Sequence, residues 1–228
     1  MSIVVLTGAG ISAESGVATF RDADGLWEGH DVAQVATPEG FAADPNLVQR
    51  FYDERRASLA SVEPNAAHLA LAELEQELGD RLLVVTQNVD DLHERAGSKN
   101  VIHMHGQLRS VWCTACDARF KWDAPLVTNP PCPGCAVPNL RPDIVWFGEI
   151  PYQMDEIQQA LLDADTFVSI GTSSEVYPAA GFVALASDVG ARTLEINLHP
   201  SRMSRVYDEV RKGPATAVVR EWVDEVLA

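Results

Sequence analysis

The four cysteines of the sequence form two Cys-x-x-Cys pairs, a pattern whose thiolates bind zinc. Fifteen residues separate the pairs, which consist of Cys113, Cys116, Cys132 and Cys135. This spacing fits a tetrahedral zinc site in which all four ligands are thiolates. Two disulfides are the alternative, which a reducing cytosol would disfavour. Since four protein ligands leave no coordination position open, we expect one structural Zn²⁺ whose loss unfolds a module over residues 106–142.

A glycine-rich turn near the start of the sequence has the composition of an anion-binding loop. The apolar run from Ile3 to Leu6 predicts a buried parallel strand, and Gly8-Ala9-Gly10 and Ser12 follow it. Glycines let backbone amides approach a phosphate, and the N-terminus of a following helix adds partial positive charge. The same short pattern also fits an ordinary tight turn before a helix.

Two further strand ends carry polar side chains that suit catalysis. The strand expected over residues 82–85 leads into Asn88 and Asp90, at the position where doubly wound sheets bind ligands. These side chains equally suit the cap of the next helix. Another apolar run ends with His103 and His105, which alternation places on the same face. Either imidazole suits general-base chemistry near neutral pH, and periodicity does not choose between them.

Apolar runs alternate with helical periodicity along the chain, which favours a parallel sheet with helices on both faces. Asp44-Pro45 signals the start of one helix, and Gly79 signals the end of another. Besides the runs already named, we expect strands over residues 101–106, 143–149, 167–170 and 193–197, and helices over 45–56, 65–78, 154–161, 178–189 and 218–226.

These elements predict an α/β fold with a doubly wound parallel, Rossmann-like sheet. The 228 residues suit a single domain with one substantial core and a small accessory module. The Rossmann-like part is expected to comprise residues 1–27, 65–105 and 143–228. A helical insertion would occupy residues 28–64, and the inserted zinc module would occupy residues 106–142.

The charge is strongly acidic, with 33 acidic against 17 basic residues and a formal net charge of -16. This balance disfavours nucleic acid and anionic membranes as direct partners. It suits a lysine-bearing protein substrate, although solubility alone explains it equally well. No apolar run reaches membrane-spanning length and the first strand starts within a few residues, so we expect a cytoplasmic protein without a signal peptide. The oligomeric state is not visible in the sequence, and a monomer is expected.

Several long stretches of the sequence match the motifs of one family in the same order. They comprise Leu6–Trp27, Thr86–Gly97, His105-Gly106, Gly171-Thr172-Ser173, Asn197-Leu198-His199 and Gly213-Pro214-Ala215. Together they resemble the sirtuins, the NAD-dependent protein deacylases, over nearly the whole chain. The resemblance implies NAD as co-substrate and acylated lysine side chains of proteins as partners. The chain departs from the family at Asp22, where a small residue is common, and at His199, where an acidic residue is common.

The resemblance also implies a role for each motif residue. His105, which directly precedes Gly106, would be the catalytic base on a ribose hydroxyl, with Asn88 beside the nicotinamide ribose. Phe20 would shield that ribose, and Arg21 would hold the nearby loop or phosphate. The substrate backbone would add as a strand between residues 148–149 and 175–177, in contact with Val176. The further expected NAD contacts are Gly8, Ala9, Gly10, Ser12, Trp27, Gln87, Val89, Asp90, Gly171, Thr172, Ser173, Asn197, Leu198, His199 and Ala215.

Tyr52 and Arg55 are three residues apart on an expected helix and share a face. A guanidinium offers two donors to a carboxylate and a phenol adds a third, so the pair suits an acidic acyl chain. From spacing alone, a solvated face is favoured. The run Phe51-Tyr52-x-x-Arg55-Arg56, however, resembles the class III sirtuins, which remove succinyl and malonyl groups.

The resemblance therefore implies removal of succinyl and malonyl groups, and to some extent acetyl groups, from lysine. The products would be nicotinamide, O-acyl-ADP-ribose and free lysine. A pure deacetylase, a mono-ADP-ribosyltransferase and a non-catalytic module that senses acyl-lysine or NAD are the alternatives. Asn88, Asp90 and His105 together argue against the last, because a binding module needs no base beside the ribose.

Overall fold

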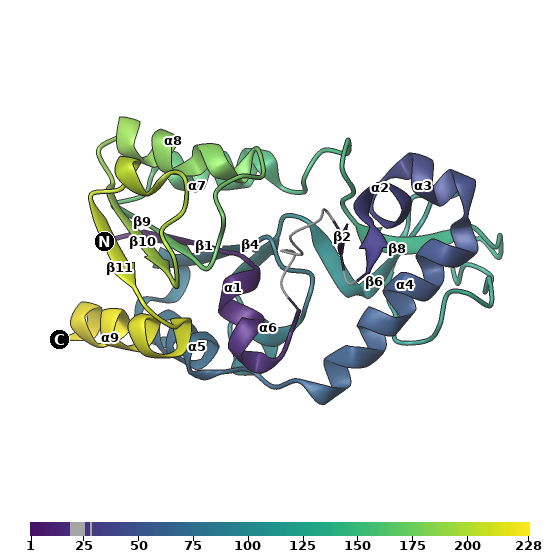
Figure 1. Ribbon diagram of the computed structural model, residues 1–228, viewed down its shortest axis with the longest axis horizontal. Coiled ribbons are helices and arrows are strands. Elements are labelled where there is room, and N and C mark those ends of the chain that lie inside the picture. Colours follow the sequence, from purple (N-terminus) through teal and green to yellow (C-terminus); the bar gives the residue numbers. More distant parts are fainter. Residues whose placement is uncertain (19–25, 28) are drawn as a thin grey trace.

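The computed structural model describes residues 1–18, 26–27 and 29–228, and its centre is a parallel sheet (Figure 1). The sheet has six strands in the order β11-β10-β9-β1-β4-β5. Their bounds are Ile3–Thr7 (β1), Leu82–Thr86 (β4), Val101–His103 (β5), Thr166–Ile170 (β9), Arg192–Asn197 (β10) and Glu209–Lys212 (β11). The chain runs outward from β1 to β5, then returns to β9 on the other side of β1. This is the doubly wound order, and it confirms the expected fold class.

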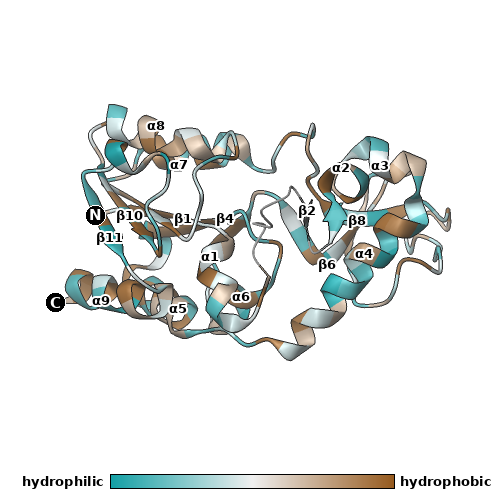
Figure 2. Ribbon diagram, viewed as in Figure 1, coloured by the Kyte–Doolittle hydropathy of each residue, from teal (hydrophilic) through white to brown (hydrophobic). Residues whose placement is uncertain are grey.

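Helices cover both faces of this sheet. The first face packs against α5 (Ala66–Leu78) and α9 (Ala215–Leu227), and the second against α7 (Met154–Leu162) and α8 (Phe182–Asp188). Along β1, Ile3 and Val5 enter the first core, whereas Val4 and Leu6 enter the second. Figure 2 shows the resulting apolar strands between the two helical layers. Burial on both faces explains why these strands are apolar runs without alternation.

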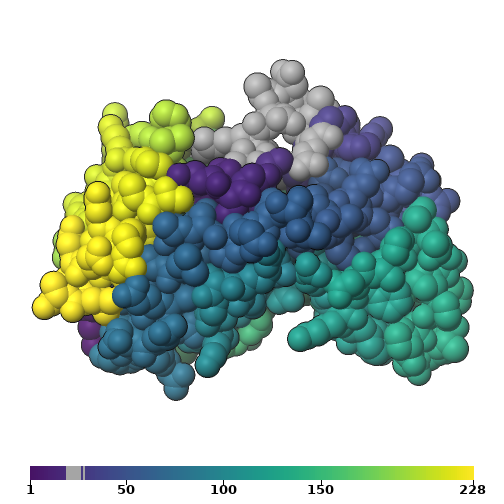
Figure 3. Space-filling model, turned by 90° about the horizontal axis from the view of Figure 1, so that it is seen from below, coloured from purple at the N-terminus to yellow at the C-terminus, as the bar shows by residue number. Residues whose placement is uncertain are grey.

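A second lobe lies beyond the carboxyl ends of these strands (Figure 1). It contains α4 (Pro45–Ser58) with the short helices α2 (Val32–Val35) and α3 (Pro38–Ala43), and the two-stranded pair β2 (Leu26–Trp27) and β3 (His30–Asp31). An antiparallel sheet in the order β7-β6-β8 completes it, with β6 at Gly106–Cys113, β7 at Arg119–Lys121 and β8 at Leu140–Ile144. In Figure 3 the zinc module stands out as the teal lobe.

The helix signals read from the sequence are confirmed. Asp44 caps α4 by accepting from the Leu47 N–H at 2.9 Å. Asn65 caps α5, which ends before Gly79. Two short helices, α1 (Ala9–Ser12) and α6 (Leu92–Ala96), follow β1 and β4 at the edge of the sheet. No helix in the described ranges is long and apolar enough to cross a membrane.

The strand expected over residues 143–149 is wrong. The strand there is β8, which ends at Ile144 and pairs antiparallel with β6. Beyond it the chain turns, because Glu149 N–H donates to the Trp146 carbonyl at 3.0 Å and Trp146 N–H donates to the Glu149 carboxylate at 2.8 Å. The expected boundary at residue 142 therefore falls within a strand of the small sheet.

Two other expectations need adjustment, and one strand has no counterpart among those expected. The run over residues 101–106 is divided between β5 and β6, because the chain turns at Gly106 with a φ of 83°. The helix expected over residues 178–189 begins as a 3₁₀ turn at Ala179–Gly181 and continues as α8. β11 was not expected at all, because its residues Glu-Val-Arg-Lys are mostly polar and lie at the sheet edge.

Candidate active site

A cavity of about 1320 Å³ lies at the carboxyl edge of the parallel sheet, with lining residues from both lobes. Nearly all of the expected NAD and substrate residues line it. They are Gly8, Ala9, Gly10, Trp27, Tyr52, Arg55, Gln87, Asn88, Val89, Asp90, His105, Gly171, Thr172, Ser173, Val176, Asn197, Leu198, His199 and Ala215. Phe20, Arg21 and Asp22 lie outside the described residues.

The glycine turn packs backbone against backbone at the point where the strand order reverses, between β1 and β9. Gly8 N–H donates to the Ile170 carbonyl at 3.0 Å, and Gly10 N–H donates to the Gly171 carbonyl at 2.8 Å. A Cβ on Gly10 would lie 2.7 Å from the Gly171 backbone, so only glycine fits there. Such a crevice at a topological switch point is where open α/β sheets bind nucleotides. The small side chains leave room for a pyrophosphate beside the backbone.

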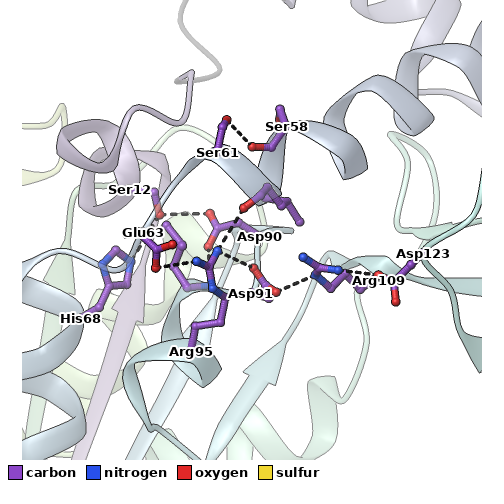
Figure 4. Close-up of polar contacts among 12 residues, drawn as sticks. Ser12, Ser58, Ser61, Glu63, His68, Asp90, Asp91, Arg95, Arg109 and Asp123 are labelled. Carbon is purple, nitrogen blue, oxygen red and sulfur yellow. Dashed lines mark hydrogen bonds and ion pairs between the residues drawn. The ribbon is translucent and has the colours of Figure 1, made fainter.

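Ser12 does not line the cavity; it lies buried directly behind it. Its hydroxyl donates to Asp90 Oδ2 at 3.0 Å and accepts from Asn88 Nδ2 at 3.1 Å. Figure 4 shows Ser12 between Asp90 and His68. Burial raises the pKa of the Asp90 carboxyl, while the hydrogen bonds from Leu92 and Ser12 oppose that rise. Ser12 thus fixes the Asn88 and Asp90 side chains.

His68 is a contributor that the sequence analysis missed. Asn65 N–H donates to its Nδ1 at 3.3 Å, so Nε2 carries the proton that faces Ser12 Oγ at 3.4 Å. Burial lowers the pKa of His68 to about 4, so the ring is neutral at pH 7. The available signal was the position of His68, three residues after the helix cap Asn65, where a side chain can bond back to the cap.

Gln87 joins the end of β4 to the end of β9, on the two sides of β1. Its Nε2 donates to Thr172 Oγ1 at 3.1 Å, and Asn197 Nδ2 donates to the Thr172 carbonyl at 2.7 Å. The three residues follow or end β4, β9 and β10. These bonds hold the polar edge of the sheet as one surface along the cavity.

His105 is oriented by the backbone. Its Nδ1 lies 3.2 Å from the Gln87 carbonyl oxygen, and since a carbonyl only accepts, Nδ1 carries the proton. Nε2 of the neutral ring is then a proton acceptor. Burial lowers the pKa of His105, although the hydrogen bond to Gln87 partly opposes this. The ring is therefore neutral at pH 7 and suited to act as a general base.

His103 has a different role in the structure. Its Nδ1 lies 3.2 Å from the Asn88 carbonyl and its Nε2 lies 2.6 Å from Glu94 Oε1. Both histidines thus face the backbone of residues 87–88, as alternation predicts. Only His105 of the two lines the cavity.

Tyr52 and Arg55 lie together at the α4 side of the cavity, and both are buried. Tyr52 Oη accepts from Trp146 Nε1 at 3.0 Å. Burial raises the pKa of the Tyr52 phenol above its ordinary value, so it remains a neutral donor. Arg55 Nη1 donates to the Phe51 carbonyl at 2.7 Å, and its guanidinium stacks 3.2 Å from the centre of the Phe51 ring. A fixed cation and a phenol therefore face the same cavity as His105.

The four cysteines converge as their spacing predicts. Their Sγ atoms lie within 4.8 Å of one another, with 3.7 Å between Cys113 and Cys135 and 3.8 Å between Cys116 and Cys132. A regular tetrahedron with Zn–S bonds of about 2.3 Å needs sulfur separations of about 3.8 Å. The four thiols thus fit a zinc ion, and their separations exclude disulfide bonds, which need about 2.05 Å.

Comparison with known proteins identifies the family. The model of the Sir2 family matches residues 8–178, which include the glycine turn, His105 and all four cysteines. The chain belongs to the Sir2 family. The resemblance to the sirtuins, which form this family, is thereby confirmed.

Two named relatives match nearly the whole length of the chain. A protein from Pasteurella multocida named NAD-dependent protein deacylase is 58% identical over 99% of this chain and 97% of its own. One of the same name from Salmonella typhimurium is 57% identical over 99% of this chain and 84% of its own.

Solved Sir2 structures share the fold of this chain. A Sir2 homologue in complex with NAD has a TM-score of 0.90 at 40% identity, covering 99% of this chain and 89% of that one. A Sir2 protein with a deacetylated p53 peptide and 3′-O-acetyl ADP ribose has a TM-score of 0.85 at 29% identity, covering 98% and 93%. The Sir2 fold therefore accounts for both lobes described here.

Proposed function

We propose that this chain is an NAD-dependent protein-lysine deacylase that removes succinyl and malonyl groups and, to some extent, acetyl groups. Lysine would be freed, and the acyl group would pass to the ADP-ribose of NAD with release of nicotinamide. The relatives named NAD-dependent protein deacylase support the reaction class. The observation that carries the acyl preference is the pair Tyr52 and Arg55 in the cavity that contains His105.

For this reaction, the main tasks of the site are to position the two substrates and to exclude water. The acyl oxygen is a poor nucleophile, so it must be held against the ribose carbon while the bond to nicotinamide breaks. Asn88 and Asp90, fixed by Ser12, are expected to hold the nicotinamide end. His105 Nε2 would then take the proton of a ribose hydroxyl, because Nδ1–H is already engaged with Gln87.

The substrate backbone is expected to lie between two segments that line the cavity. Gly148 and Glu149 belong to the first segment, and Glu175, Val176 and Tyr177 belong to the second. Arg141 Nη1 holds the Glu149 carboxylate at 2.7 Å, which fixes the first segment. Because an added strand is recognised by main-chain bonds, selectivity for sequence should be loose.

The acyl preference follows from donor chemistry. The Tyr52 phenol and the Arg55 guanidinium can both donate to the terminal carboxylate of a succinyl or malonyl chain. Stacking on Phe51 limits the freedom of Arg55, so less entropy is lost when the carboxylate binds. An acetyl group leaves these donors without a substrate partner, which is why acetyl removal should be the slower reaction.

The test uses matched peptides with succinyl-lysine and acetyl-lysine, with and without NAD, followed by nicotinamide release and product masses. In the Arg55→Met variant, kcat/KM for succinyl should fall about 10- to 100-fold, the value of a lost charge-assisted hydrogen bond. Acetyl turnover should change little. Arg50→Met is the matched control, because Arg50 is exposed on the same helix and does not line the cavity.

Each outcome distinguishes one alternative. Equal losses for both acyl groups in Arg55→Met would remove the selectivity role of Arg55. A wild-type protein that acts only on acetyl-lysine would be a deacetylase with a different use for this pair. Labelled protein in place of O-acyl-ADP-ribose would identify a mono-ADP-ribosyltransferase.

A further inference from the structure

Helix α4 carries a second set of polar side chains, which bonds it to the zinc module. Gln49, Asp53 and Arg56 are spaced by four and three residues, so they share one face of the helix. Gln49 Nε2 donates to the Leu140 carbonyl at 3.3 Å, and Arg56 Nε donates to the Leu108 carbonyl at 2.6 Å. This face of α4 is therefore bonded to β8 and β6.

Asp53 makes the most contacts of the three. Both of its carboxylate oxygens accept from Leu126 N–H at 2.8 Å, and Oδ2 also accepts from Val127 N–H at 3.0 Å. Arg56 Nη1 donates to Oδ1 at 2.7 Å, and the exposed fractions of the Arg56 and Asp53 side chains are only 3% and 11%. Charge-assisted bonds at this burial hold geometry more firmly than a surface ion pair does.

The segment that Asp53 binds belongs to the core of the zinc module. The Leu126 side chain is buried in a cluster with Cys113, Cys132 and Leu140, while its N–H faces Asp53. Arg56 Nη1 adds a bond to the Ala124 carbonyl at 3.3 Å. The register of α4 against the zinc module is thus fixed at Asp53 and Arg56.

The residues that face the acyl end of the cavity are the chain neighbours of these two. Tyr52 precedes Asp53 and Arg55 precedes Arg56 on the same rigid turns of α4. Tyr52 and Arg55 line the cavity, whereas Asp53 and Arg56 do not. A small slide or rotation of α4 would therefore move the phenol and the guanidinium together, relative to His105.

We propose that Asp53 and Arg56 are positioning residues for acyl selectivity, because they hold α4 in the register at which Tyr52 and Arg55 reach an acidic acyl chain. This inference rests on the proposed function. Selectivity among acyl groups is then set partly by contacts outside the pocket, between α4 and the segment over residues 124–127.

The test measures kcat/KM for matched succinyl and acetyl peptides in Asp53→Asn, Arg55→Met and the double variant. The amide of Asn accepts at one oxygen only and places N–H donors against those of Leu126 and Val127. We expect the succinyl-to-acetyl ratio to fall about tenfold, since displacing a substrate-positioning group by about 1 Å costs up to about 100-fold. In the Arg55→Met background the Asp53 substitution should change the ratio much less than in the wild type, because only the Tyr52 phenol still depends on the register of α4.

Asp123→Asn is the matched control, because Asp123 pairs with Arg109 inside the zinc module and forms no hydrogen bond or ion pair with α4 among the described residues. It should leave the ratio unchanged. If Asp53→Asn folds poorly, Arg56→Lys replaces the planar guanidinium without removing the charge and should lower the ratio in the same direction. If the wild-type protein favours succinyl and the ratio is unchanged in both α4 variants, the inference is wrong while the proposed function stands. A wild type without succinyl activity would overturn the proposed function and the inference with it.

Discussion

At the scale of single residues, a backbone carbonyl fixes the tautomer of His105, the base that we propose. The Gln87 carbonyl engages His105 Nδ1, and no carboxylate of the described residues bonds to that ring. Without an adjacent anion, nothing raises the basicity of the imidazole strongly, and burial lowers its pKa. The arrangement therefore keeps the His105 ring neutral, and so able to accept a proton, over a wide pH range.

This geometry predicts the pH dependence of deacylation. His105 accepts a proton only when neutral, so activity falls as pH falls through its pKa. Because burial lowers that pKa from its ordinary value of 6.5, the acid limb of kcat/KM should have its midpoint below 6.5. An acetyl-lysine peptide is the substrate of choice here, since it has no acyl carboxylate that titrates.

The His30→Asn variant is the control for this profile, because His30 lies on β3 and does not line the cavity. It should leave the midpoint where it is. A midpoint at about pH 7 or above in the wild type would mean that burial does not govern the pKa of the base.

At the scale of elements, the turn after β1 and the turn after β9 meet with no side chains between them. Gly8 and Gly10 meet Gly171 backbone to backbone, which joins two strands that are neighbours in the sheet but distant in the sequence. The same approach shapes the floor on which a pyrophosphate would lie.

Adding one methyl group to this contact should therefore disturb both stability and NAD binding. In Gly10→Ala the new Cβ would meet the Gly171 backbone at 2.7 Å, and overpacking of this kind costs about 1–3 kcal/mol. Urea unfolding would measure the loss, and calorimetric titration with NAD would measure the weaker binding. In the control Gly181→Ala, the Cβ has an ordinary contact of 3.8 Å, so stability should be unchanged or rise by up to about 1 kcal/mol. Equal behaviour of the two variants would show that the turn can relax.

The elements also show what the sequence could predict and what it could not. The helix ends at Asp44, Asn65 and Gly79 could be predicted from the sequence, because capping depends on a few neighbouring residues. The β1 strand is apolar because both its faces are buried. The pairing of β8 with β6 depends on a partner more than 25 residues away, and apolar composition does not say which sheet a strand joins.

In the candidate site, too, some features could be predicted from the sequence and others could not. The strand-end positions of Asn88 and His105 follow from topology, which brings the carboxyl ends of parallel strands to one edge. The contact between His68 and Ser12 joins a helix start to a turn 56 residues earlier, and only the folded chain brings them together. From the sequence, Asp53 and Arg56 would be placed on a solvent-exposed helix face. In the structure, both instead form hydrogen bonds with the zinc module.

At the scale of the whole molecule, the two lobes have separate cores. Two apolar clusters lie on the faces of the parallel sheet, and one of the others contains Cys113 and Cys132. The zinc module contacts α4, and its other contacts with the rest of the chain include the bond between Arg109 and Asp91 at 2.7 Å and the bond from Leu108 N–H to the Val89 carbonyl at 2.8 Å. Val89 and Asp91 follow β4 and lie outside the strands of the parallel sheet. Loss of order in the module should therefore reach α4 before it reaches the parallel sheet.

Zinc removal tests this order directly. A chelator under reducing conditions should remove one zinc ion per chain, measured by metal analysis, and should raise amide hydrogen exchange over residues 106–142. Exchange in α4 should rise next, because Asp53 loses an ordered Leu126 N–H partner. The strands β1, β4 and β9 should keep their protection, because their cores lie on the other lobe. Uniform loss of protection would instead show that the two lobes unfold as one cooperative unit. Unchanged exchange in the zinc-free protein would mean that packing of Val111, Leu126 and Leu140 alone keeps the module folded.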